Sequence, residues 1–298
     1  MSAASNTRSH RIGLLCLAVT SLGWGLNWPA MKALLQELPP LFARGSAGLV
    51  AALVFAAVAA ARGQSLRVAL PLWPRLGAAA LLNVFAWMGF STLSLQWLHA
   101  GQAAMLVYTM PIWATLLAWP IAQQRPSLRA ALGLVVCAAG LWLLFGGAPV
   151  ANVDRGPLVG VGFALAAALG FALGTVALRP LAAMTPLANL AWQLGLGCLP
   201  MLLISAVHEP LLLATVSARS WALMLYMTAI PMGLCYLTWF AALRRLPPAT
   251  ASIATLATPV VGVFAAAWAL GEPLGARQLA ALALTLAGVA LALRRGAP

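Results

Sequence analysis

The chain has 298 residues, of which 63% are hydrophobic and 7% charged, and its mean hydropathy is +0.96. A soluble domain carries about 25% charged residues, so this composition excludes an ordinary soluble protein and indicates a membrane protein. The formal net charge of +13 is typical of nucleic-acid-binding proteins, but the basic residues are scattered between apolar runs, and we expect no nucleic-acid partner.

Apolar runs of roughly the 20 residues that a membrane-spanning helix needs follow one another along the chain, joined by short loops. These runs are continuous and rich in Ala and Leu, which favours helices over the alternating strands of an outer-membrane barrel. We therefore predict an all-α polytopic membrane protein. Its ten transmembrane helices are expected at 13–31, 41–61, 76–96, 100–122, 129–147, 157–178, 187–207, 220–243, 248–270 and 276–293.

Basic and acidic residues are divided between alternate loops. Most of the 17 Lys and Arg residues precede the first run, follow the even-numbered runs or end the chain, where no acid occurs. The other loops hold the rest of the charges, namely Lys32, Arg44, Arg155, Arg219, Arg277 and the four acids Glu37, Asp154, Glu209 and Glu272. Because Lys and Arg concentrate in cytoplasmic loops, we predict a bacterial inner-membrane protein with both termini in the cytoplasm.

The second half of the chain repeats the first. Pro111 and Arg129 correspond to Pro259 and Arg277 at one constant spacing, and similar matches run through the flanking apolar segments. The repeated unit contains five predicted helices, and an odd number of crossings turns the second copy upside down. We predict two inverted five-helix repeats, 1–148 and 149–298. Inverted repeats are typical of transporters with a site near the middle of the membrane.

A short pattern in the second half resembles a known family. It consists of Arg244-Arg245, Thr258-Pro259, Glu272-Pro273 and a last helix that reaches Gly288. This pattern resembles the EamA type of the drug/metabolite transporter superfamily, and both halves fit it, although Arg125 stands where the second half has Glu272. The Trp-rich ten-helix chain is most similar to YddG-type exporters of aromatic amino acids. The resemblance implies ten helices, a central cavity and export from the cytoplasm.

Polar and aromatic residues recur at helical spacing within several runs, as in Trp24, Asn27 and Trp28 or Asn83 and Trp87. Asn is costly in lipid unless it is paired or faces water, so such stripes indicate a solute pathway. The alternatives are that Asn joins neighbouring helices and that hydroxyl groups bond their own backbone. The predicted substrate-binding residues are Trp24, Asn27, Trp28, Asn83, Trp87, Ser91, Tyr108, Thr109, Phe171, Thr175, Cys235, Trp239, Thr255 and Thr258.

Pro111 and Pro259 lie inside equivalent runs and are predicted hinges, because a proline removes a backbone hydrogen bond. No Asp or Glu lies within a predicted run, so we expect no buried carboxylate relay for ion coupling. Glu272 is expected to cap a helix end or to pair near Arg277. No metal cluster and no ATP-binding motif occur, and we expect no cofactor.

These features predict an alternating-access exporter whose partners are the lipid bilayer and a small amphipathic solute, with amino acids, including aromatic ones, as the first choice. A nucleobase or a lipophilic drug is the alternative cargo. An intramembrane enzyme would need a Ser/His, His/Asp or metal-ligand set within the runs, and no His or acid lies there. The oligomeric state is left open.

Overall fold

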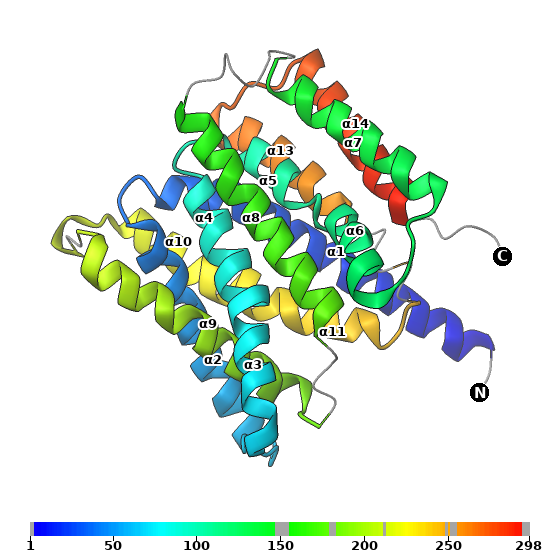
Figure 1. The fold of residues 1–298 in the computed structure, drawn as a ribbon. Coiled ribbons are helices and arrows are strands. Elements are labelled where there is room, and N and C mark those ends of the chain that lie inside the picture. Colours follow the sequence, from blue (N-terminus) through cyan, green and yellow to red (C-terminus); the bar gives the residue numbers. More distant parts are fainter. Residues whose placement is uncertain are drawn as a thin grey trace.

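The computed structural model describes residues 3–146, 155–178, 183–210, 213–247, 250 and 255–293, and every regular element in these ranges is helical (Figure 1). Within them, 8 helical segments are long and apolar enough to cross a membrane. Two shorter apolar helices, Leu128–Leu144 and Ala257–Leu270, lie at the fifth and ninth predicted runs. The all-α class is confirmed, and the count of ten crossings stays a prediction. The proposed repeat boundary at 148/149 lies outside the described residues.

Six of the runs form single helices in the described ranges, namely α1 (Ala3–Leu34), α2 (Pro40–Ala61), α7 (Leu128–Leu144), α8 (Arg155–Ala177), α9 (Pro186–His208) and α14 (Ala276–Leu293). The ninth run contains α13 (Ala257–Leu270), which follows a turn at Thr255 and Leu256. Short 3₁₀ turns, η1 (Leu70–Leu72) and η4 (Leu213–Thr215), lie in two of the loops.

The third and eighth runs contain π-helical segments at equivalent positions. The third run comprises α3 (Trp73–Ala80), the π-helical η2 (Leu81–Phe90) and α4 (Ser91–Ser94). The eighth comprises α10 (Ala218–Ala229), the π-helical η5 (Ile230–Leu234) and α11 (Cys235–Leu243). A π-helical hydrogen bond spans one more residue than an α-helical one, so these segments change which residues share a helix face.

The fourth run is broken into α5 (Ala100–Val107) and α6 (Met110–Ala122). Pro111 lies in the first turn of α6, where its missing N–H disrupts no helical hydrogen bond. Pro259 lies correspondingly in the first turn of α13, just after a turn at Thr255 and Leu256. Both prolines therefore mark the start of a helical segment, and bending at these places stays a prediction.

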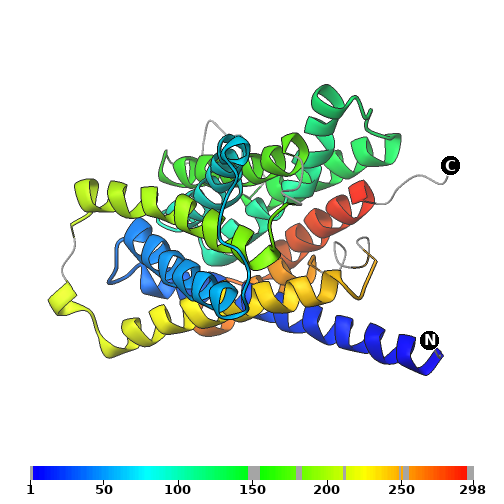
Figure 2. The ribbon, with the colours of Figure 1, turned by 90° about the horizontal axis from the view of Figure 1, so that it is seen from below.

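The helix contacts come in equivalent pairs. α2 packs along α9, and α7 packs along α14. α1 contacts α13 and α11, whereas α8 makes the corresponding contacts with α6 and η2. These contacts relate corresponding runs of the two halves, and the inverted orientation of the halves stays a prediction. The first turns of α1 and the last turns of α14 lie toward the same side of the bundle (Figures 1 and 2).

α7 and α14 approach each other through glycines. A Cβ atom at Gly133 would lie 2.5 Å from the Gly288 carbonyl oxygen, and a Cβ atom at Gly288 would lie 2.5 Å from the Gly133 carbonyl oxygen. Because lipid offers no hydrophobic drive between helices, small residues that permit close backbone contact stabilise such pairs.

Three carboxylates connect helices at one end of the bundle. Glu209 accepts hydrogen bonds from the backbone N–H groups of Leu41 and Phe42, at 3.0 Å each, where α2 begins. Glu272 accepts from Ala100 at 2.5 Å and from Gly101 at 3.0 Å, where α5 begins. The first N–H groups of a helix lack partners and carry partial positive charge. Glu272 therefore caps a helix, as expected, and that helix belongs to the other half of the chain.

Glu37 plays the same part for α10. It accepts a hydrogen bond of 2.7 Å from the Ser217 backbone N–H and one of 2.9 Å from the Ser217 hydroxyl. Lys32 complements these caps by donating to the carbonyl oxygens of Leu95 and Leu98, just after α4. We call Glu37, Glu209 and Glu272 the carboxylate caps, and their end of the bundle the capped end.

The Gly133–Gly288 contact predicts a loss of stability when a methyl group is added. In Gly288→Ala the new Cβ would meet backbone atoms at 2.5 and 2.6 Å, which cannot move aside as a side chain can. Overpacking costs about 1–3 kcal/mol, so we expect a lower melting temperature for the purified protein. Gly162→Ala is the matched control, because nothing lies within 4 Å of its added Cβ. Equal melting temperatures of the two variants would contradict the close contact between Gly133 and Gly288.

The capped end predicts a pH-dependent contribution to stability. The Ser217 backbone N–H, followed by the Ser217 and Ser220 hydroxyls, lowers the pKa of Glu37 below its ordinary 4.5. A carboxyl with a lowered folded-state pKa stabilises the fold above pH 4.5 and loses this contribution as pH falls through the lowered value. The melting temperature of wild type should therefore exceed that of Glu37→Gln at pH 7, and this difference should vanish in acid. A difference in melting temperature that does not change with pH would contradict the cap.

Candidate functional site

A cavity of about 820 Å³ lies within the bundle. At one end its wall includes the exposed loop residues Gln124 and Arg125, between α6 and α7, and Leu293 at the end of α14. This end follows the last turn of α6, whereas Glu272 caps the first turn of α5 in the same run. The cavity therefore reaches the end of the bundle opposite the carboxylate caps.

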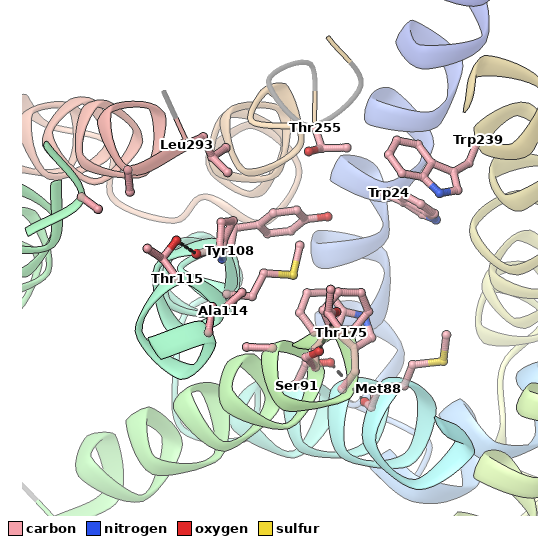
Figure 3. A pocket seen from close by; sticks show the side chains of 18 of the residues that line it. Trp24, Met88, Ser91, Tyr108, Ala114, Thr115, Thr175, Trp239, Thr255 and Leu293 are labelled. Carbon is pink, nitrogen blue, oxygen red and sulfur yellow. Dashed lines mark hydrogen bonds between the residues drawn. The ribbon is translucent and has the colours of Figure 1, made fainter. Parts of the chain in front are cut away.

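One side of the cavity is an aromatic cluster of Trp24, Tyr236 and Trp239 (Figure 3). The Trp24 ring centroid lies 5.6 Å from that of Tyr236 in an edge-on arrangement and 5.8 Å from that of Trp239. The Trp24 indole N–H donates to the Pro231 carbonyl oxygen at 3.0 Å. Since Pro231 lies in the π-helical η5, this segment supplies the acceptor that fixes the indole.

A second aromatic cluster comes from four different runs. The Trp87 ring centroid lies 4.7 Å from that of Phe171 and 6.1 Å from that of Tyr108. Tyr108 also packs edge-on against Trp28, with centroids 6.4 Å apart. The break between α5 and α6 places Tyr108 at the cavity. The two clusters together give apolar, polarisable faces that suit a flat or apolar solute group.

Polar groups lie between the aromatic residues of the cavity wall. Ser91, Thr115 and Thr175 donate their hydroxyl hydrogens to carbonyl oxygens of their own helices, at 3.1, 2.9 and 2.8 Å. Their oxygen lone pairs remain able to accept hydrogen bonds. The side-chain oxygen of Asn27 is different, because it is buried and has no hydrogen-bond partner in the described part of the chain.

Most of the residues predicted from sequence lie in the cavity wall. They are Trp24, Asn27, Trp28, Trp87, Ser91, Tyr108, Phe171, Thr175, Trp239, Thr255 and the predicted hinge Pro111. Their arrangement is seen in Figure 3, where Ser91 and Thr175 lie across the cavity from Trp24 and Trp239. Binding of a solute by these residues stays a prediction.

Asn83 does not line the cavity, although its spacing from Trp87 predicted a shared face. It lies at the contact of η2 with α8, where a Cβ atom at Gly174 would overlap the Asn83 side-chain oxygen. The spacing of four residues from Trp87 therefore did not bring Asn83 into the cavity wall. Asn83 thus fills the space that Gly174 leaves between two helices.

Cys235, Thr109, Thr258 and Pro259 also lie outside the cavity wall. Cys235 is fully buried against α1, at a place where Gly23 leaves room for its sulfur. The Thr109 hydroxyl donates to the Leu106 carbonyl oxygen at 2.6 Å, which is the backbone bonding that sequence left as an alternative. Thr258 and its neighbour Pro259 are buried in the first turn of α13, which packs against α1.

Arg44 is a charged wall residue that is absent from the binding residues predicted from sequence. We grouped it with the loop charges, although it lies within the predicted run 41–61, and α2 begins at Pro40. Its side chain is only 7% exposed, and its Nε donates to the Thr92 hydroxyl at 3.0 Å. A charge placed inside an otherwise apolar run is the sequence signal that could have identified it.

Comparisons with known proteins agree with this arrangement. A model of the EamA-like transporter family matches residues 11–146 and again residues 158–294. Two Bacillus subtilis proteins named as uncharacterized transporters are similar: YvbV is 27% identical, covering 93% of this chain and 90% of its own, and YoaV is 25% identical, covering 84% and 86%. A Salmonella typhimurium protein named a probable amino-acid metabolite efflux pump is 27% identical over 94% of each chain.

A solved crystal structure is similar with a TM-score of 0.65, over 96% of each chain and at 21% identity. At this identity the likeness shows the fold alone. The family model, in contrast, matches both halves of the sequence and so accounts for the paired helix contacts. The chain belongs to the EamA-like transporter family.

Proposed function

We propose that this protein is an alternating-access exporter of small amphipathic metabolites, with aromatic and other apolar amino acids as its first substrates. The observation that carries the proposal is the cavity of about 820 Å³ with two aromatic clusters and interspersed polar groups. Small-molecule sites commonly measure about 300–1,000 Å³ and combine apolar walls with a few polar groups. The relative named an amino-acid metabolite efflux pump supports the same class of substrate.

The orientation of the protein in the membrane is inferred from the charge pattern. The exposed Arg125 at the cavity mouth belongs to a loop that is basic and free of acids, and such loops face the cytoplasm. The carboxylate caps then lie at the outer surface of a bacterial inner membrane. In this arrangement the structure corresponds to a state open to the cytoplasm and closed by the capped end.

Export requires the two ends to open in turn. The breaks at Tyr108-Thr109 and before Pro259, together with the π-helical η2 and η5, are places where helical segments can shift without losing whole rows of hydrogen bonds. No acid belongs to the cavity wall in the described part of the chain. We therefore propose transport down the gradient of the solute itself, without proton coupling through a carboxylate.

The aromatic wall predicts the effect of removing one ring. Trp87→Ala should lower flux of labelled phenylalanine from proteoliposomes about tenfold, the factor that 1.4 kcal/mol produces, because Trp87 contacts both Tyr108 and Phe171. Trp268→Ala is the matched control, since Trp268 lies outside the cavity wall and is 89% exposed on the surface of α13. Uracil and a lipophilic cation are included as alternative cargo.

Two results would contradict the proposal. Equal phenylalanine flux in Trp87→Ala and Trp268→Ala would place the transport pathway elsewhere. Flux of uracil or of the lipophilic cation, with no flux of any amino acid, would replace amino acids by that cargo. Both variants must first elute and melt as folded protein in detergent.

A further inference from the structure

Arg44 is a buried cation in the wall of the cavity, within the membrane-spanning part of α2. We propose that its guanidinium group is the receptor for a substrate carboxylate, so that the cavity selects solutes carrying a carboxylate over amines and amides of the same shape. This inference rests on the proposed function, because it assigns the charge of the solute that occupies the same cavity.

Burial of Arg44 calls for a counter-charge. A charged group taken out of water loses its solvation, and an opposite charge or several hydrogen bonds must compensate this loss. Glu37, Glu209 and Glu272 are already bound to the first backbone groups of three helices. In the described ranges no carboxylate contacts the guanidinium, whose hydrogen bond there is the one to Thr92.

The bond to Thr92 also prepares the guanidinium for a ligand. It occupies Nε at 3.0 Å and orients the planar group, while the terminal N–H groups make no hydrogen bond within the described part of the chain. Paired terminal N–H groups match the two oxygens of a carboxylate, which they bind through two parallel hydrogen bonds. A fully buried threonine, with 0% of Thr92 exposed, is a rigid partner for this purpose.

The remaining groups of the wall suit the rest of an amino acid. Asn27 belongs to the cavity wall, and its buried side-chain oxygen has no hydrogen-bond partner in the described part of the chain. The faces of Trp24 and Trp28 can attract a cation, and the aromatic clusters accept the apolar side chain. At the mouth, Arg125 gives the cavity entrance the same sign of charge as Arg44, which attracts anionic groups from solution.

Binding of four phenyl compounds to the purified full-length protein separates the contribution of the substrate carboxylate from that of the ammonium group. The probes are phenylalanine, 3-phenylpropionate, phenylalanine amide and phenethylamine, of which only the first two carry a carboxylate. Wild type should bind these two at least about tenfold more tightly than the others. Losing a hydrogen bond to a charged group costs about 1.5–3 kcal/mol, so Arg44→Gln should weaken carboxylate binding roughly 10- to 100-fold and leave phenethylamine unchanged.

Three further variants make the test specific. Arg44→Lys keeps the charge without the paired N–H groups, and should give intermediate affinity for 3-phenylpropionate. Thr92→Val keeps Arg44 but removes the bond to its Nε, and should weaken carboxylate binding even if Arg44→Gln fails to fold. Arg67→Gln removes an exposed cation outside the cavity wall and should leave all four affinities unchanged.

The outcomes separate this inference from the proposed function. A wild type without preference for carboxylates, or a folded Arg44→Gln that keeps the preference, overturns the inference even if amino acids are transported. Binding of 3-phenylpropionate that depends on Arg44, without flux of any amino acid, supports the carboxylate receptor and refutes amino acid export. A loss of all four affinities in a folded Arg44→Gln would make Arg44 a structural residue and overturn its role as receptor.

Discussion

The unpaired N–H groups at the starts of membrane helices are the constraint on which this structure depends. The first N–H groups of a helix have no partner within that helix and carry partial positive charge, so a carboxylate there is stabilising. At the capped end, Glu37, Glu209 and Glu272 each follow a helix of one half and bond the first residues of a helix of the other half. The same three contacts satisfy helix ends and hold the two halves together.

The caps give a physical reason for the distribution of charge in the sequence. Carboxylates are favourable at helix starts, and cations are favourable at helix ends. Lys32 beside the end of α4 follows the second half of this rule. At the opposite end of the bundle the cavity reaches Gln124 and Arg125.

Sequence reasoning predicted the all-α class and much of the cavity wall, because apolar run length and the spacing of Trp24, Asn27 and Trp28 depend only on local helical geometry. It placed Asn83 on the cavity face, whereas Asn83 lies at the contact of η2 with α8. It omitted Arg44, which we grouped with the loop charges although it lies within an apolar run whose helix begins at Pro40. The carboxylate caps join distant residues, and no local pattern reveals such pairs.

We propose that one cavity opens at either end in turn and that the capped end is closed in the present state. The most direct measurement is labelling of Ser91→Cys, in a background without other cysteines, by an impermeant thiol reagent applied to either side of the membrane. Crosslinking Glu37→Cys to Ser217→Cys should abolish labelling from the outer side and preserve it from the cytoplasmic side. Unchanged outer labelling after crosslinking, or no labelling from the cytoplasmic side, would contradict the account.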